Sequence, residues 1–160
     1  MIDKAQVIGV WRAVLLERLE ILSSSQEAAR SGTRVDGEHR PANRGERAAV
    51  TSQGYLAHAF GARTKVLQSH LNNLDDMGDG PRSEVVVGAM ITVSLDDGPA
   101  QHIAIFPGGD ATKLKVDGQP VTVLSAQSPM AAQLRDTEAG EAVEIELGGD
   151  LLVVELHTIA

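Results

Sequence analysis

The sequence contains no cysteine and very few aromatic residues. Without cysteine, disulfide bonds, thiolate metal sites and cysteine nucleophiles are all excluded. The aromatic residues are one Trp, one Tyr and two Phe, 2% of the chain, so a packed core must be built from Val, Leu, Ile and Ala. Proteins that bind single-stranded nucleic acid usually stack the bases on aromatic rings. So few rings argue against that class of protein.

Long hydrophobic runs are also missing. No segment approaches the roughly 18 consecutive apolar residues that identify a membrane-spanning helix, and the N-terminus lacks a basic region followed by a long apolar stretch. These absences predict a protein with no membrane partner that stays in the cytoplasm.

Charge is divided unequally along the chain, whose formal net charge is −8. Residues 1–77 contain ten Lys or Arg against nine Asp or Glu, a net +1, whereas residues 78–160 contain four against thirteen, a net −9. Binding to duplex DNA depends on a basic surface that displaces counterions. The acidic half is therefore not expected to bind duplex DNA directly.

Apolar residues in the first half recur at steps of three or four, which is typical of amphipathic helices. A first helix is expected from about Asp3 to about Arg30, and a second helix ends before Gly78. Between them, residues 31–45 contain three glycines and a proline, which interrupt helices. Two such helices usually bury their apolar faces against each other as an antiparallel hairpin, here a coiled coil. The alternative is that both helices pack on the C-terminal part as a helical bundle.

The apolar face of each helix can be read from these steps. The first helix is expected to bury Val7, Ile8, Trp11, Leu15, Leu19 and Leu22. The second is expected to use Ala49, Gln53, Leu56, Phe60, Leu67, Leu71 and Leu74, with Arg63 as a polar exception.

Residues 78–83, with two glycines and a proline, predict a linker between a hairpin domain at 1–77 and a β-rich domain at 84–160. Clusters of β-branched residues between Gly, Pro and Asp turns predict strands over 85–87 with 90–95, and over 101–106, 113–116, 121–124, 142–147 and 151–159. Ser128 before Pro129 predicts the start of a short helix over 130–135. The expected fold class is therefore α+β.

Several motifs, taken in order and spacing, resemble the GreA/GreB family of bacterial transcription elongation factors over nearly the full chain. In the second helix these residues are Asn43, Ala48, Ala49, Gln53, Gly54 and Tyr55. In the second half they are Val87, Gly88, Ala89, Ile91 and Val93, followed by Ser128, Pro129, Met130, Leu134, Gly140, Glu141 and Val143. The resemblance implies an FKBP-like fold for the β-rich domain.

The resemblance also implies a partner and a mechanism. In that family the C-terminal domain docks on RNA polymerase at the rim of the secondary channel, and the hairpin tip enters the channel. Two tip carboxylates, spaced Asp-x-x-Glu, help the polymerase to hold a second Mg²⁺ and a water, so that it cuts the RNA of a backtracked complex. The implied partners are bacterial RNA polymerase and the 3′ end of the nascent RNA, with no cofactor beyond a shared Mg²⁺. The implied docking residues are Ser128, Pro129 and Met130.

The acidic tip motif is altered in this sequence. When Asn43, Gln53 and Gly54 are aligned with the family pattern, the two acidic positions fall on His39 and Ala42. Alanine cannot bind a metal, and neutral histidine is a poor ligand for Mg²⁺. The residues that would replace the acids in catalysis are Asp36, Glu38 and Glu46, with Asp36 and Glu38 as metal ligands; alternatively, these are ordinary solvated side chains.

Arginine surrounds these acids. Residues 30–47 contain five positive charges, including Arg30, against three negative ones. A positive tip favours contact with RNA phosphate or with an acidic loop of the polymerase over capture of a cation. The alternative is an ordinary solvated helical surface. The expected tip contacts are Arg34, His39, Arg40, Arg44 and Arg47.

The leading hypothesis is a regulator that binds RNA polymerase with weak or no stimulation of transcript cleavage and is not itself an enzyme. One alternative is an active cleavage factor that uses the acids near the tip. Another is a prolyl isomerase or peptide-binding protein, suggested by the FKBP-like fold alone, with Phe106 as the main candidate for an apolar pocket.

Overall fold

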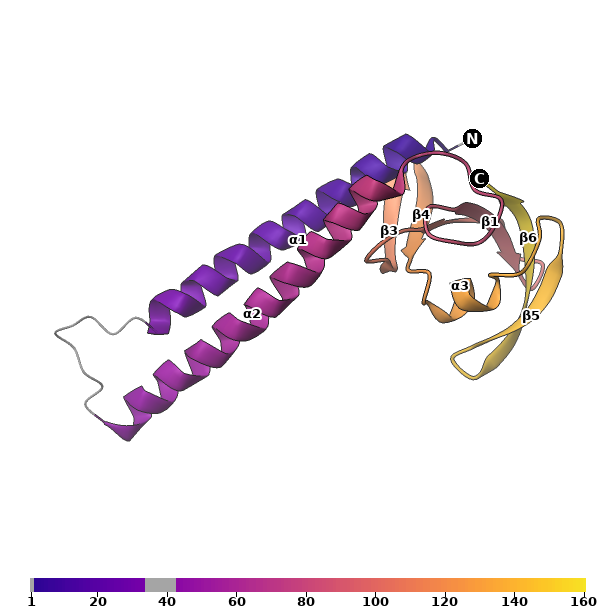
Figure 1. Ribbon diagram of the computed structural model, residues 1–160. Coiled ribbons are helices and arrows are strands. Elements are labelled where there is room, and N and C mark those ends of the chain that lie inside the picture. The colour runs from indigo at the N-terminus through magenta and orange to yellow at the C-terminus, as the bar shows by residue number, and fades with distance from the viewer. Residues whose placement is uncertain (1, 34–42) are drawn as a thin grey trace. The chain divides into compact units, whose positions relative to one another are not determined.

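The computed structural model describes residues 2–33 and 43–160 of the chain. Two long helices come first, followed by strands that are interrupted by one short helix (Figure 1). The elements are α1 (Lys4–Thr33), α2 (Arg44–Met77), β1 (Met90–Leu95), β2 (Gln101–Ile105), β3 (Asp110–Val116), β4 (Gln119–Leu124), α3 (Pro129–Gln133), β5 (Ala142–Leu147) and β6 (Asp150–Ile159). The expected fold class, a helical hairpin followed by a β-rich domain, is confirmed. The FKBP-like description stays a prediction.

The two long helices lie side by side and antiparallel (Figure 1). A guanidinium nitrogen of Arg12 on α1 lies 2.5 Å from a carboxylate oxygen of Asp75 on α2. Further along, the side-chain amide of Gln26 lies against Gly61. The residue numbers 12 and 75, like 26 and 61, add up to 87. A constant total is what two antiparallel helices in one register require.

The buried face of α2 differs from the expected one at three positions. Ala49 and Arg63 are exposed, and Leu56 is 46% exposed. Hydrophobicity favours Leu56 over its neighbour Ala57, but it is Ala57 that is buried. The inward face steps alternately by three and four residues, the period of a coiled coil, through Val50, Gln53, Ala57, Phe60, Thr64, Leu67, Leu71 and Leu74.

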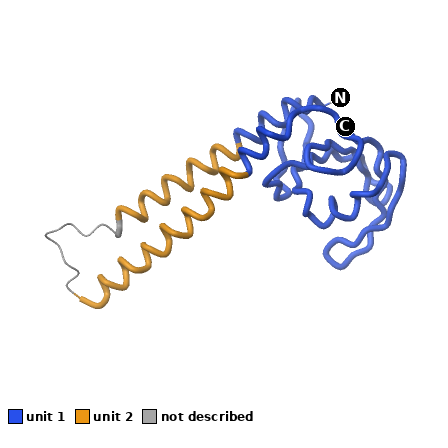
Figure 2. Tube along the Cα trace, in the orientation of Figure 1, with its two compact units in different colours: residues 1–13, 70–160 blue, residues 14–69 orange. Residues whose placement is uncertain are grey.

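Contacts divide the chain into two compact units (Figure 2). One unit contains residues 1–13 and 70–160, and the other contains residues 14–69. The division falls inside α1 and α2, so the predicted domain boundaries around 78–83 stay a prediction.

The β-rich part is a six-stranded sheet in the order β3-β4-β2-β1-β6-β5. β2 and β4 pair in parallel, whereas all other neighbours pair antiparallel. The last strand, β6, therefore lies inside the sheet between β1 and β5.

One face of this sheet carries an aliphatic cluster, and residues of the opposite face, among them Ala104, Val121 and Val123, are also buried. The cluster contains no aromatic residue, and α3 and its C-cap contribute Ala131 and Leu134 to it. Each fully buried aliphatic side chain stabilises the fold by roughly 1.5–3 kcal/mol. The strand residues of this cluster are Ile91, Val93, Ile103, Ile105, Ile145, Val154 and Leu156.

Two predicted elements are corrected by the structure. The strand expected over 85–87 is wrong, because the Ala89 amide donates to the Val86 carbonyl in a turn in which Gly88 has a φ of +93°. Val85 is still only 1% exposed, so its apolar side chain serves the core without belonging to a strand. The short helix is also shorter than expected, because Leu134 is its C-cap and donates to the Met130 carbonyl.

Candidate functional site

The predicted tip residues lie only partly within the described chain. Those outside the described residues are Arg34, Asp36, Glu38, His39 and Arg40, so their roles stay predictions. Arg44, Glu46 and Arg47 lie in the first turn of α2, and all three are exposed.

Asn43 caps the start of α2. Its side-chain oxygen accepts a hydrogen bond from the Glu46 amide at 2.9 Å, and its carbonyl accepts one from the Arg47 amide at 3.3 Å. An N-cap side chain satisfies one of the amide groups that a helix leaves unpaired at its start. Glu46 then stands at the third helical position, where a carboxylate interacts favourably with the helix dipole. Helix capping therefore accounts for a glutamate at position 46 without any role in binding a metal.

Helix capping does not account for the two arginines of this turn. A positive charge at a helix N-terminus is unfavourable, by about 0.3–1 kcal/mol for each exposed group. Arg44 and Arg47 therefore add positive charge at a position where it does not help the helix.

No group of three or more His, Asp or Glu side chains that could hold a metal is found among residues 2–33 and 43–160. The Mg²⁺ role predicted for Asp36 and Glu38 falls outside this part of the chain and stays a prediction.

The predicted docking residues have structural roles at the start of α3. The Ser128 hydroxyl accepts a hydrogen bond from the Ala131 amide at 3.3 Å and caps the helix, and Pro129 begins it. Met130 is half-buried and packs against the sheet core. Of the three, Pro129 alone is exposed.

Gln133, which sequence reasoning missed, fastens α3 to β5. Its side-chain nitrogen donates to the Glu146 carbonyl and its side-chain oxygen accepts from the Glu146 amide, both at 2.9 Å. A side-chain amide can satisfy a backbone donor and acceptor at once. No local pattern in the sequence could have identified this pair.

The helix ends within residues 1–13 and 70–77 are anchored to the turn between β2 and β3. Trp11, which is fully buried, donates from its indole nitrogen to the Pro107 carbonyl at 3.0 Å. On α2, His70 lies so close to Gly108 that a Cβ there would come within 2.5 Å of the ring nitrogen. The two helices therefore hold the turn at Pro107 and Gly108 between an indole and an imidazole.

Arg82 fixes the segment after α2. Its guanidinium donates to the carbonyls of Met77 at 2.7 Å, Gly80 at 3.3 Å and Val87 at 3.3 Å. The ammonium group of Lys4 on α1 also donates to the Gly80 carbonyl. Burial lowers the pKa of Lys4, the positive charge of Arg82 lowers it further, and Asp79 partly offsets both effects.

An Arg82→Ala variant is expected to lose about 2 kcal/mol of unfolding free energy, because hydrogen bonds from a charged donor contribute roughly 1.5–3 kcal/mol. Arg82 is only partly buried, so the expected loss lies below the upper end of this range. Urea denaturation followed by tryptophan fluorescence measures the change, since Trp11 belongs to the same compact unit. Arg135→Ala, at an exposed position of that unit, is the control and should change little. Equal loss in both variants would contradict the role given to Arg82.

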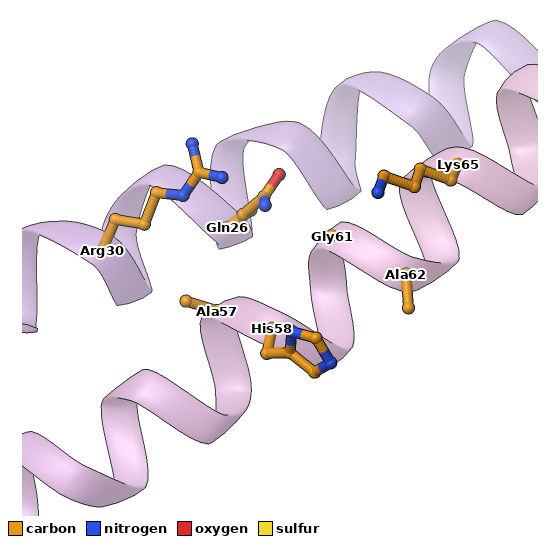
Figure 3. A pocket seen from close by; sticks show the side chains of 7 residues that line it. All are labelled: Gln26, Arg30, Ala57, His58, Gly61, Ala62 and Lys65. Carbon is orange, nitrogen blue, oxygen red and sulfur yellow. The ribbon is translucent and has the colours of Figure 1, made fainter.

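An open hollow lies between α1 and α2 around Gly61 (Figure 3). Its lining residues are Gln26, Arg30, Ala57, His58, Gly61, Ala62 and Lys65. Arg30 belongs to the arginine cluster seen in the sequence, whereas Gly61 and Lys65 were missed. The feature of the sequence that could have indicated this hollow is a glycine, Gly61, inside the apolar pattern of the second helix.

A serine, a histidine and a glutamate lie in line on β1 and β6. The Ser94 hydroxyl is 2.8 Å from Nε2 of His157, and Nδ1 of His157 is 3.6 Å from a Glu155 oxygen. The order resembles a nucleophile, a base and an orienting acid. However, Ser94 is 6% exposed, and 3.6 Å is too long for a hydrogen bond. The cluster is therefore a polar contact between strands rather than a hydrolytic site.

No helix in the described part of the chain combines the length and hydrophobicity needed to cross a membrane.

Comparison with known proteins found no matching protein-family model and no matching curated protein. Among solved structures, GreA factor homolog 1 (Gfh1) of Thermus thermophilus is 12% identical, with 93% of this chain and 94% of that chain covered and a TM-score of 0.36. A structure described as the transcription factor Gfh1 is 15% identical, with 94% and 93% covered and a TM-score of 0.38. Gfh1 of Thermus aquaticus is 14% identical, with 90% and 92% covered and a TM-score of 0.38. At these identities and scores, the similarity identifies neither a family nor a function for this chain.

Proposed function

We propose that this protein is a transcription regulator that binds bacterial RNA polymerase and presents its hairpin tip to the secondary channel, with weak or no stimulation of transcript cleavage. The proposal rests on the sequence motifs that resemble the GreA/GreB family. It is supported by the confirmed order of a helical hairpin followed by a β-rich domain.

The observation that carries the proposal is the charge at the start of α2. Arg44 and Arg47 are exposed in the first helical turn, where the helix dipole opposes positive charge. Their presence is explained by an acidic partner, such as an RNA phosphate or a polymerase carboxylate cluster. Because the C-terminal half carries a net −9, duplex DNA is a poor candidate for the whole surface.

The two alternatives receive less support. An active cleavage factor would use Asp36, Glu38 or Glu46, and Glu46 follows the helix cap Asn43 in the capping-box pattern. A prolyl isomerase would need an accessible apolar pocket, but Phe106 is fully buried and cannot line one. Most of the residues that line the hollow beside β2, β3 and β4 have polar side chains, among them His102, Lys113 and Thr122.

The test is binding to purified bacterial core RNA polymerase. The parent chain is expected to bind, and an Arg44→Ala/Arg47→Ala variant to bind about three- to tenfold more weakly, since exposed charge pairs contribute about 0.2–1 kcal/mol each. In the same preparation, backtracked complexes with Mg²⁺ should not shorten their RNA faster than polymerase alone.

Arg63→Ala is the matched control, because Arg63 is an exposed arginine on the same helix away from the first turn. It should leave polymerase binding unchanged. Absence of any association between the parent chain and the polymerase would reject the proposal. Rapid RNA shortening that is lost in an Asp36→Ala/Glu38→Ala variant would establish the cleavage-factor alternative.

A further inference from the structure

The hollow around Gly61 has a floor made by small residues. Ala57 is buried and Gly61 has no side chain, so α2 presents little side-chain bulk at this part of the hollow. Gln26 of α1 fills part of the space, because a Cβ on Gly61 would come within 2.6 Å of its amide nitrogen. The lining exposes more carbon than polar surface, which suits the flat apolar face of a ligand.

Positively charged side chains approach this floor from both helices (Figure 3). In the antiparallel register, Arg30 lies one turn of α1 beyond Gln26, and Lys65 lies one turn of α2 beyond Gly61. Side chains on a helix lean toward its N-terminus. Because the helices run in opposite directions, the side chains of Arg30 and Lys65 lean toward each other, and both lean toward the position of Gln26 and Gly61.

The two charged side chains that line the hollow, Arg30 and Lys65, are both positive. His58 adds an imidazole, and Gln26 adds a side-chain amide whose nitrogen lies against Gly61. Among the residues that the structure describes, no carboxylate lines the hollow. The nearest in sequence is Glu27, and both Glu27 and Arg30 already make polar contacts in the structure. An incoming anion must therefore compete with such contacts for the Arg30 guanidinium.

We propose that this hollow binds a nucleoside triphosphate, with the phosphates between Arg30 and Lys65 and the nucleoside on the floor formed by Ala57, Gly61 and Ala62. A guanidinium offers planar, paired donors that match phosphate oxygens, and an ammonium adds a point charge. The apolar floor distinguishes a nucleotide from a bare inorganic anion. The proposal does not depend on polymerase binding.

Calorimetric titration of the full chain with ATP, in EDTA and low salt, tests the site. ATP is expected to bind, whereas adenosine and inorganic pyrophosphate each bind at least about tenfold more weakly, because each keeps only one part of the contact surface. Higher salt should weaken ATP binding, since the contacts are exposed and screened. Pyrophosphate as tight as ATP, or a ten-nucleotide RNA bound while ATP is not, would overturn the proposal.

Four variants locate the site. Arg30→Gln and Lys65→Gln should each weaken ATP binding about three- to tenfold, and Glu27→Gln should strengthen it by removing a competing negative charge. Gly61→Ala keeps every charge and improves helix propensity, but its Cβ displaces the Gln26 amide and raises the floor, so it should also weaken binding.

Arg63→Gln removes an exposed arginine that does not line the hollow, and it should leave ATP affinity within twofold of the parent, about the scale of a minor electrostatic effect. Circular dichroism of each variant checks that the helices remain. No ATP binding at millimolar concentration, or an affinity unchanged by both Arg30→Gln and Gly61→Ala, would reject the site.

Discussion

Replacement of Trp11 by alanine is expected to lower the unfolding free energy by about 3–5 kcal/mol, the usual cost of removing a buried large aromatic side chain. Trp11 is fully buried, and its indole nitrogen donates to the Pro107 carbonyl. The variant therefore loses packing and leaves a backbone acceptor without its partner. Small domains are stable by only about 5–15 kcal/mol, so this one change removes a large share of the total.

The measurement is urea denaturation followed by far-ultraviolet circular dichroism, because Trp11 is the sole tryptophan and fluorescence disappears with it. Trp11→Phe is the companion variant, which keeps most of the ring contacts and loses the hydrogen-bond donor. It should cost about 1–2 kcal/mol. If Trp11→Ala unfolds within 1 kcal/mol of the parent, roughly the effect of an average substitution, the anchoring role of Trp11 is wrong.

Gly109→Ala is expected to cost at least about 3 kcal/mol, because the added Cβ meets backbone rather than a movable side chain. It would lie 2.1 Å from the Leu124 carbonyl carbon and 2.5 Å from the Ser125 nitrogen. That stretch cannot retreat freely, since the Leu124 carbonyl accepts a hydrogen bond from the Phe106 amide at 2.9 Å. The turn after β2 and the end of β4 must separate for the methyl group to fit.

Gly148→Ala is the comparison for Gly109→Ala, because it adds the cost of a strained backbone conformation without the cost of a steric clash. Gly148 has a φ of +63°, and no atom lies within 4 Å of the place that a Cβ would take, so alanine there meets strain alone, about 1–2 kcal/mol. Thermal and urea denaturation of both variants should show a clearly larger loss for Gly109→Ala. Equal losses would mean that the close approach at Leu124 is not what requires glycine.

Turn chemistry and periodicity made most of the elements predictable. One of the Asp turns expected between the strands contains Asp96 and Asp97, whose φ values of +46° and +59° are those that a tight hairpin turn requires. Ser128 and Pro129 occupy the expected cap and first position of a helix. These features depend on neighbours in sequence, so a single sequence is enough to read them.

Features that depend on distant partners were not predictable. The parallel pairing of β2 with β4 requires the chain to pass through β3 first, and nothing in any one strand encodes it. On α2, Ala57 is buried and Leu56 is exposed, because the inward face is set by the register of the whole hairpin and not by the hydrophobicity of one residue. Arg82 looked like an ordinary linker residue, because its carbonyl partners become acceptors only once the chain folds around it.

The candidate site was predictable to a smaller degree. The arginine-rich character near the tip was visible in the sequence, and Arg44 and Arg47 are exposed as that prediction needs. The hollow at Gly61 arises from residues of two helices that meet only through the hairpin register. Its convergence of charge could not be read from either helix alone.

The place of β6 within the sheet sets an order on events during synthesis. β6 pairs with both β1 and β5, so β5 has no strand to pair with until residues 150–159 have left the ribosome. The hairpin helices are complete by residue 77 and can pair long before that moment. A nascent chain paused before residue 150 would thus carry a formed hairpin and an open, unpaired edge at β1, a species that needs protection from association with other chains.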